Sequence, residues 1–171
     1  MSTTFAADDA ARSTLLEHRA RMLAAPRVAP DDAAGADWME ILLFNIDGEQ
    51  FAIPLASMVA IAPVSSITPL PRAVAPVYGV TAWRGRPLTV LTLGPVHAID
   101  AAERRLIVLG DGRRAVAGLL VGEVGETRTV LRAALVPPHQ GPRRAMALGM
   151  TDDAVLVLDA DAMLDSARPG S

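Results

Sequence analysis

The apolar residues of this chain come in paired runs that are joined by short polar turns. The segment "MEILLFNIDGEQFAIPL" (39–55) holds two apolar runs on either side of Asp47-Gly48, and "RLIVLGDGRRAVAGLLV" (105–121) repeats this arrangement around Asp111-Gly112. An Asp-Gly pair tolerates positive φ, which the tight turn of a β-hairpin requires. Both segments are therefore predicted to be β-hairpins.

The two hairpins belong to a longer internal repeat. The first runs of the two hairpins align 64 residues apart, with Leu42, Leu43 and Phe44 over Leu106, Ile107 and Val108. A later pair of segments, "WRGRPLTVLTL" (83–93) and "MTDDAVLVLDA" (150–160), aligns 67 residues apart and places Val90-Leu91 over Val157-Leu158. This order predicts two related β units in tandem.

The predicted strands are short, and turns recur about every 8–12 residues, which favours small antiparallel barrels or a sandwich over a parallel sheet. Residues 7–25 are rich in helix formers and predict an N-terminal helix, followed by a Pro-rich linker over 26–37. Residues 159–167 predict a short C-terminal helix.

One apolar run, "VYGVTAWRGRPLTVLTL" (77–93), is interrupted by Arg84-Gly85-Arg86 next to Trp83. Two interpretations remain open on the residues alone. The arginines lie in a hairpin turn and are solvated, or the turn is part of a binding surface, where Arg and aromatic residues are favoured.

Composition removes several classes of function. The chain has 171 residues, 51% hydrophobic, with a formal net charge of -3, no Cys and no Lys. No clustered basic surface for nucleic acid is expected, and lysine-based, thiol-based and cysteine-metal chemistry is excluded. No signal peptide or transmembrane run is evident, so a cytoplasmic protein without membrane insertion is expected.

No catalytic constellation stands out. His18, His97 and His139 have no carboxylate or second histidine at ligand spacing, and "GLLVGEVGE" (118–126) lacks the order of a phosphate loop. Asp152-Asp153 could serve as an acid and base pair, but the repeat places them in a turn. We therefore expect no enzymatic activity, no cofactor and no metal.

The ordered motifs of residues 41–165 resemble the CheW-like domain of bacterial chemotaxis coupling proteins. The motifs are the first hairpin with Ile53-Pro54-Leu55 and Val59, the proline-punctuated loop "ITPLPRAVAPVYGV" (67–80), the turn "AWRG" (82–85) where the family has "NLRG", and the closing "VLVLDADAML" (155–164). The resemblance covers about three quarters of the chain.

The resemblance implies a mainly β fold of two tandem five-stranded SH3-like barrel subdomains, at about 38–96 and 104–160 of a domain spanning 38–168. Residues 1–37 would be the N-terminal helix and linker. It implies a non-enzymatic adaptor that couples the regulatory domain of a CheA-type histidine kinase to the cytoplasmic tips of chemoreceptors. Other CheW-like proteins are further partners, and recruitment to membrane receptor arrays is expected.

The resemblance also implies the partner-binding residues. Arg84 occupies the family arginine position, Gly85, Trp83 and Ala82 complete its turn, and Val59 and Ile61 would line a groove for a receptor helix. The sequence departs from the family at Ala82, where Asn is usual, at Ile61, where an acid is usual, and near Thr92, where Asp is usual.

Three alternatives stay open: a divergent protein that binds only the kinase or another CheW-like partner, a small-ligand-binding barrel with a pocket near Trp83, and a hydrolase using Asp152, Asp153 and His139.

Overall fold

The computed structural model describes residues 37–64, 66–110, 114–138, 141 and 143–167. The predicted N-terminal helix (7–25), most of the linker, the Asp111-Gly112 turn, His18 and His139 lie outside the described residues. The strands are β1 (Trp38–Ile46), β2 (Glu49–Pro54), β3 (Met58–Pro63), β4 (Thr68–Pro69), β5 (Val77–Trp83), β6 (Arg86–Leu91), β7 (Arg105–Gly110), β8 (Ala115–Val121), β9 (Val124–Leu131), β10 (Ala147–Met150) and β11 (Leu156–Leu158). Four short 3-10 helices (Leu55–Ser57, Val96–Ala98, Arg132–Ala134 and Arg144–Met146) and one α-helix, α2 (Ala160–Ser166), complete the described elements.

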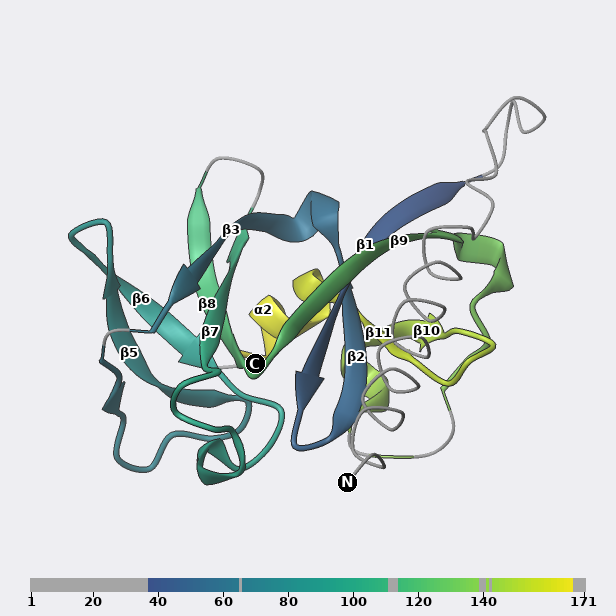
Figure 1. The fold of residues 1–171 in the computed structure, drawn as a ribbon. Coiled ribbons are helices and arrows are strands. Elements are labelled where there is room, and N and C mark those ends of the chain that lie inside the picture. The colour runs from purple at the N-terminus through teal and green to yellow at the C-terminus, as the bar shows by residue number, and fades with distance from the viewer. Residues whose placement is uncertain (1–36, 65, 111–113, 139–140, 142, 168–171) are drawn as a thin grey trace, which may run out of the picture. The chain divides into compact units, whose positions relative to one another are not determined.

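The strands form two sheets whose strand orders correspond, apart from β4, which only sheet B has (Figure 1). Sheet A has the order β10-β11-β2-β1-β9, and sheet B has the order β3-β7-β8-β6-β5-β4. Each sheet is built on a hairpin, β1–β2 or β7–β8, whose second strand pairs in parallel with β11 or β6. The mainly β prediction is confirmed, but sheet B has six strands instead of five, and each sheet is mixed.

The sheets do not follow the predicted division at about 38–96 and 104–160. Sheet A combines β1 and β2 with β9, β10 and β11 from the second half of the domain, while sheet B combines β3 to β6 with β7 and β8. The chain passes from sheet A to sheet B at β3 and returns to sheet A at β9 (Figure 1). The repeat is real, but its two copies are interleaved because each hairpin takes its outer strands from the other half.

The strand pairing agrees with the predicted repeat at the level of whole strands. Strand β6, which carries Val90, pairs with β8 in sheet B, and strand β11, which carries Val157, pairs with β2 in sheet A. The strand pairs β5–β6 and β10–β11, to which these residues belong, also share an irregularity. The pairing register shifts between Val77 and Gly79 in sheet B and between Ala147 and Gly149 in sheet A.

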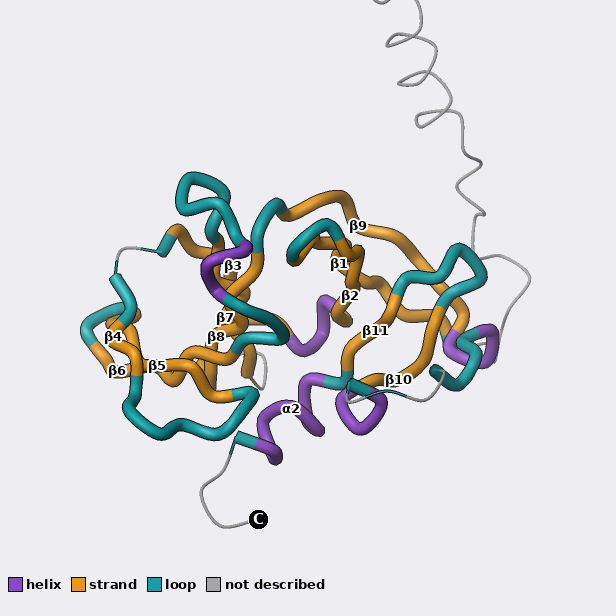
Figure 2. Tube along the Cα trace, turned by 90° about the horizontal axis from the view of Figure 1, so that it is seen from below, coloured by secondary structure: helices purple, strands orange, loops and turns teal. Residues whose placement is uncertain are grey.

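Strand β1 is buried on both of its faces. Leu42, Phe44 and Ile46 belong to the main core, which contains residues of both sheets, while Ile41 and Leu43 belong to a second core of sheet A. This explains why the apolar run of β1 does not alternate with polar residues. Helix α2 lies between the two sheets in both views (Figure 2) and places Met163 in the main core.

Both sheets curl. The second core is lined by residues from all five strands of sheet A, so this sheet wraps around it. In sheet B the outer strands β3 and β4 are joined by residues 64–67 alone. That connection spans at most about 18 Å, whereas six flat strands would measure about 24 Å across. The edges of sheet B must therefore approach each other.

We expect Gly79→Ala to destabilise the domain. A Cβ atom at Gly79 would lie 2.5 Å from the carbonyl oxygen of Thr68, on the neighbouring strand. Overpacking of this kind costs about 1–3 kcal/mol. Urea unfolding should show this loss, whereas Gly94→Ala, whose Cβ would be 3.8 Å from its nearest neighbour, should change the free energy of unfolding by less than about 0.5 kcal/mol. Equal effects of the two substitutions would contradict the close approach.

Candidate functional site

The "AWRG" segment forms the tight turn between β5 and β6. Trp83 pairs with Arg86, and the two residues between them have positive φ, 49° at Arg84 and 74° at Gly85. Positive φ at both central residues matches a type I′ hairpin turn. The prediction that Arg84-Gly85 is a turn between two strands is therefore confirmed.

Arg84 stacks on the ring of Trp83 at the tip of this hairpin. The guanidinium carbon lies 4.4 Å from the ring centroid, within the range of a cation–π contact. Trp83 is half-buried and packs against the main core, while Arg84 is exposed. The ring thus fixes the direction of the guanidinium, whose charge faces solvent.

Arg84 is not a residue that the turn itself favours. The first turn of the repeat places Asp47, with φ of 53°, and Gly48 at the same two positions. Asp and Asn tolerate this left-handed conformation, whereas other side chains pay about 1 kcal/mol or more for it. A strained residue at an exposed tip is a reason to suspect a function for its side chain.

The other predicted site residues lie in two places. Ala82 is exposed on β5 beside the turn and pairs with Pro87. Val59 and Ile61 lie on β3, where Val59 packs against the core and Ile61 is 46% exposed. In the strand order of sheet B, β7, β8 and β6 stand between β3 and β5 on one side, whereas only β4 stands between them where the edges of the sheet approach. A common groove for the two groups stays a prediction.

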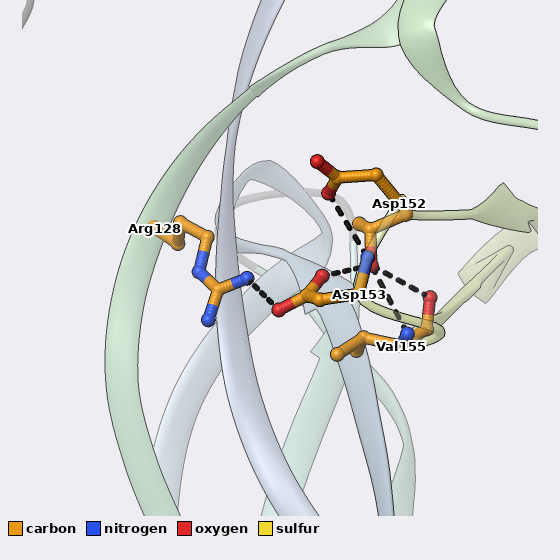
Figure 3. A network of polar contacts seen from close by, with 5 residues as sticks. Arg128, Asp152, Asp153 and Val155 are labelled. Atoms are coloured by element: carbon orange, nitrogen blue, oxygen red, sulfur yellow. Dashed lines mark hydrogen bonds and ion pairs between the residues drawn. The ribbon is translucent and has the colours of Figure 1, made fainter.

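The turn between β10 and β11 is the counterpart of the β5–β6 turn in sheet A, and it is tied down internally (Figure 3). The Thr151 hydroxyl donates to Asp153 Oδ1 at 2.6 Å and accepts from the backbone N–H of Val155 at 3.0 Å. Asp153 Oδ2 accepts from Arg128 Nη1 at 2.5 Å. Arg128 lies on β9, one outer strand of sheet A, and Asp153 follows β10, the other. The ion pair thus connects the two edges of the curled sheet.

These contacts give Asp152 and Asp153 structural partners. The hydrogen bond from Thr151 and the one from Arg128 lower the pKa of Asp153 below its ordinary 3.8. Asp152 accepts from the backbone N–H of Asp153 at 3.0 Å. A general acid for hydrolysis near neutral pH requires a raised pKa, so the direction at Asp153 is opposite to what the hydrolase alternative needs.

Two threonines were missed by the sequence reasoning. Thr81 and Thr151 are the buried polar residues of the described chain, and each follows a glycine by two positions, in Gly79-Val80-Thr81 and Gly149-Met150-Thr151. Thr81 Oγ1 donates to the Ser66 carbonyl at 2.5 Å, so it joins β5 to the segment before β4. The recurrence of this triplet 70 residues apart was the available signal.

Within the described residues, no group of three or more His, Asp or Glu side chains could hold a metal ion. None of the helices in that part of the chain is long and apolar enough to cross a membrane.

The structure is thus a β domain of two sheets with two equivalent turns. The β10–β11 turn is held by hydrogen bonds and an ion pair, and the β5–β6 turn is exposed. The profile of the CheW-like domain family matches residues 40–168, and the chain belongs to this family. The crystal structure of the scaffolding protein TtCheW from Thermoanaerobacter tengcongensis has a similar fold. It matches with a TM-score of 0.57 and 21% identity, over 70% of this chain and 83% of that one. No curated protein is similar enough in sequence to count as a match.

We expect the Arg128–Asp153 pair to contribute stability that is lost in acid. Because the pKa of Asp153 is lowered in the folded state, its contribution is complete above the unfolded-state pKa near 3.8 and disappears as pH falls through the folded-state pKa. Both side chains are more than a third exposed, so a double-mutant cycle should give a coupling of only about 0.2–1 kcal/mol at pH 6.

The cycle is measured by urea unfolding at pH 6 and repeated at pH 3, where the coupling should be smaller. Asp152→Asn is the matched control, since Asp152 has no ion pair with a described residue, and it should leave the coupling intact. A coupling that does not weaken in acid would contradict this assignment.

Proposed function

We propose that the protein is a non-enzymatic scaffold of chemotaxis-type signalling, which couples a CheA-type histidine kinase to chemoreceptors. The observation that carries this proposal is the exposed Arg84 guanidinium held on Trp83 at the tip of a strained turn, in a chain that belongs to the CheW-like domain family. TtCheW is a scaffolding protein, which supports the same role here.

Arg84 would recognise the receptor by charge-assisted hydrogen bonds. A guanidinium presents a planar fork of donors that suits a carboxylate or the free carbonyl groups at a helix end. The stack on Trp83 limits the conformations of the arginine before binding, so less entropy is lost when the contact forms. The receptor tip is helical in the family, and such a helix offers both kinds of acceptor.

The departures at Ala82 and Ile61 make the surrounding surface more apolar. Ala82 offers no amide beside the turn, and Ile61 exposes a branched apolar side chain on β3 where the family has an acid. A partner matched to this surface would present apolar groups around a single acceptor for Arg84. This chemistry favours a receptor, or another array component, that differs from the usual family partner.

The regulatory domain of the kinase would dock on an edge of a sheet. Edge strands of sheet B expose Ile61 on β3, and Leu70 and Val74 follow the other edge strand, β4, with exposures of 43% and 80%. A like-folded domain could extend this packing, and a specific interface would bury about 1,200–2,000 Å² in total. Such a complex would place the protein in the cytoplasm, at membrane-associated receptor arrays.

We expect Arg84→Asn to separate binding from stability. Asn is favoured at the positive φ of this turn, so the melting temperature should stay the same or rise. Loss of a charge-assisted contact should weaken binding to a receptor-tip fragment about 10-fold or more. Isothermal titration calorimetry gives the affinity, and thermal unfolding gives the stability.

The control for this substitution is Arg86→Asn, two residues further on and also exposed. It should leave the affinity nearly unchanged. If both variants bind equally weakly, general electrostatics explains the effect, and a fall in stability for Arg84→Asn alone would show that the arginine is structural.

We also expect direct binding to the kinase regulatory domain. Purified protein should retain that domain in a pull-down at micromolar concentration. The Ile61→Glu variant should still fold, because Ile61 is 46% exposed. Failure to bind any CheA-type regulatory domain at that concentration would remove the coupling role, even if the receptor fragment still binds.

A further inference from the structure

A cleft between the two sheets lies apart from the turn that carries Arg84. It has a volume of about 1000 Å³ and is lined by residues of β2, β10 and β11 from sheet A, by Ala75 and Pro76 before β5, and by the Thr92–Gly94 segment after β6. Neither Trp83 nor Arg84 lines it. Cavities of about 300–1,000 Å³ with mostly apolar walls and a few polar groups are typical of small-molecule sites.

The walls of the cleft are apolar. Phe51, Leu93, Met146, Met150 and Leu156 line it, and all but Phe51 are only partly buried. The two methionines supply flexible, polarisable surface that adapts to varied ligands. This lining would accept an aliphatic tail.

Arg143 fixes one side of the cleft. Its Nη1 forms an ion pair with Glu49, its Nη2 donates to the Leu93 carbonyl at 3.0 Å, and its guanidinium lies 5.1 Å from the centroid of the Phe51 ring. Glu49 and Phe51 belong to sheet A, and Leu93 follows β6 of sheet B. Arg143 therefore joins the two sheets, and its charge is compensated by Glu49.

Arg144 leaves one positive charge at the mouth. It lines the same cleft and is exposed, and its guanidinium makes no hydrogen bond or ion pair with another described residue. Two guanidiniums and one carboxylate thus line the cleft. Among the described lining residues, the charge of Arg144 is the one left without an ion-pair partner, and it lies beside apolar walls.

We propose that this cleft binds a small monocarboxylate with an aliphatic tail, with the carboxylate at Arg144 and the tail against Met146, Met150 and Leu156. One uncompensated guanidinium matches one carboxylate charge, whereas a doubly charged phosphate would remain only half neutralised. The cleft lies between the sheets, so an occupied site would add contacts between them and raise the melting temperature. This inference does not depend on the proposed coupling function.

Octanoate is the probe, and hexanoate and octylammonium are its matched comparisons. Calorimetry with the full chain should show saturable binding of octanoate. Each buried methylene is worth about a four-fold change in affinity, so hexanoate, which is shorter by two methylenes, should bind about 15-fold more weakly. Octylammonium, with the same tail and the opposite charge, should bind more weakly than octanoate, because Arg144 repels it instead of attracting it.

Two pairs of variants locate the site. Arg144→Gln should weaken octanoate binding about two- to five-fold, as expected for an exposed ion pair, while Arg86→Gln should not. Ala145→Trp places a large ring in the cleft lining at the middle of one 3-10 helix and should abolish binding. Ala133→Trp, at the middle of another 3-10 helix outside the lining, should not.

The proposal is overturned if octanoate does not bind at millimolar concentration or binds no better than octylammonium. It is also overturned if Ala145→Trp, folded by circular dichroism and with an unchanged melting temperature, still binds octanoate normally. Should Ala145→Trp fail to fold, the comparison of Arg144→Gln with Arg86→Gln decides, and equal affinities for those two variants would reject the site.

Discussion

The exchange of strands between the two halves of the domain is the constraint on which the rest of this structure depends. Neither hairpin can complete a sheet with its own neighbours, because β2 takes β11 as its parallel partner and β8 takes β6. The main core is consequently common to both sheets and to α2. Tight points such as Gly79 and Gly149 occur where an outer strand closes against the rest. The position of the β5–β6 turn is thus set by both halves of the chain.

Local features of this fold were predictable from the sequence, whereas its long-range pairing was not. Asp47-Gly48 and Arg84-Gly85 carry their turn chemistry in two residues, and Asp159 caps α2 by accepting from the N–H groups of Asp161 and Ala162. The repeat identified equivalent strands such as β6 and β11 correctly. It could not show that each pairs with the other half's hairpin, because no local pattern encodes the choice between two equivalent partners.

The candidate sites divide in the same way. Trp83 and Arg84 were found because a charge interrupts an apolar run and because the turn fits a family motif. The roles of Arg128 and Arg143 depend on contacts with residues 25 and 94 positions away, and no spacing in the sequence signals such contacts. The cleft beside Arg143 is formed by segments from both sheets, so it exists only after the strands have exchanged.

The two equivalent turns have different freedom to evolve. A mutation of Asp153 removes its contacts with Thr151 and Arg128 and therefore loosens the closure of sheet A. Within the described residues, the Arg84 side chain interacts with its own neighbour Trp83 alone, so substitutions at this tip leave the body of the domain intact. A duplicated element with one constrained copy and one unconstrained copy lets a lineage change partners without risking its fold.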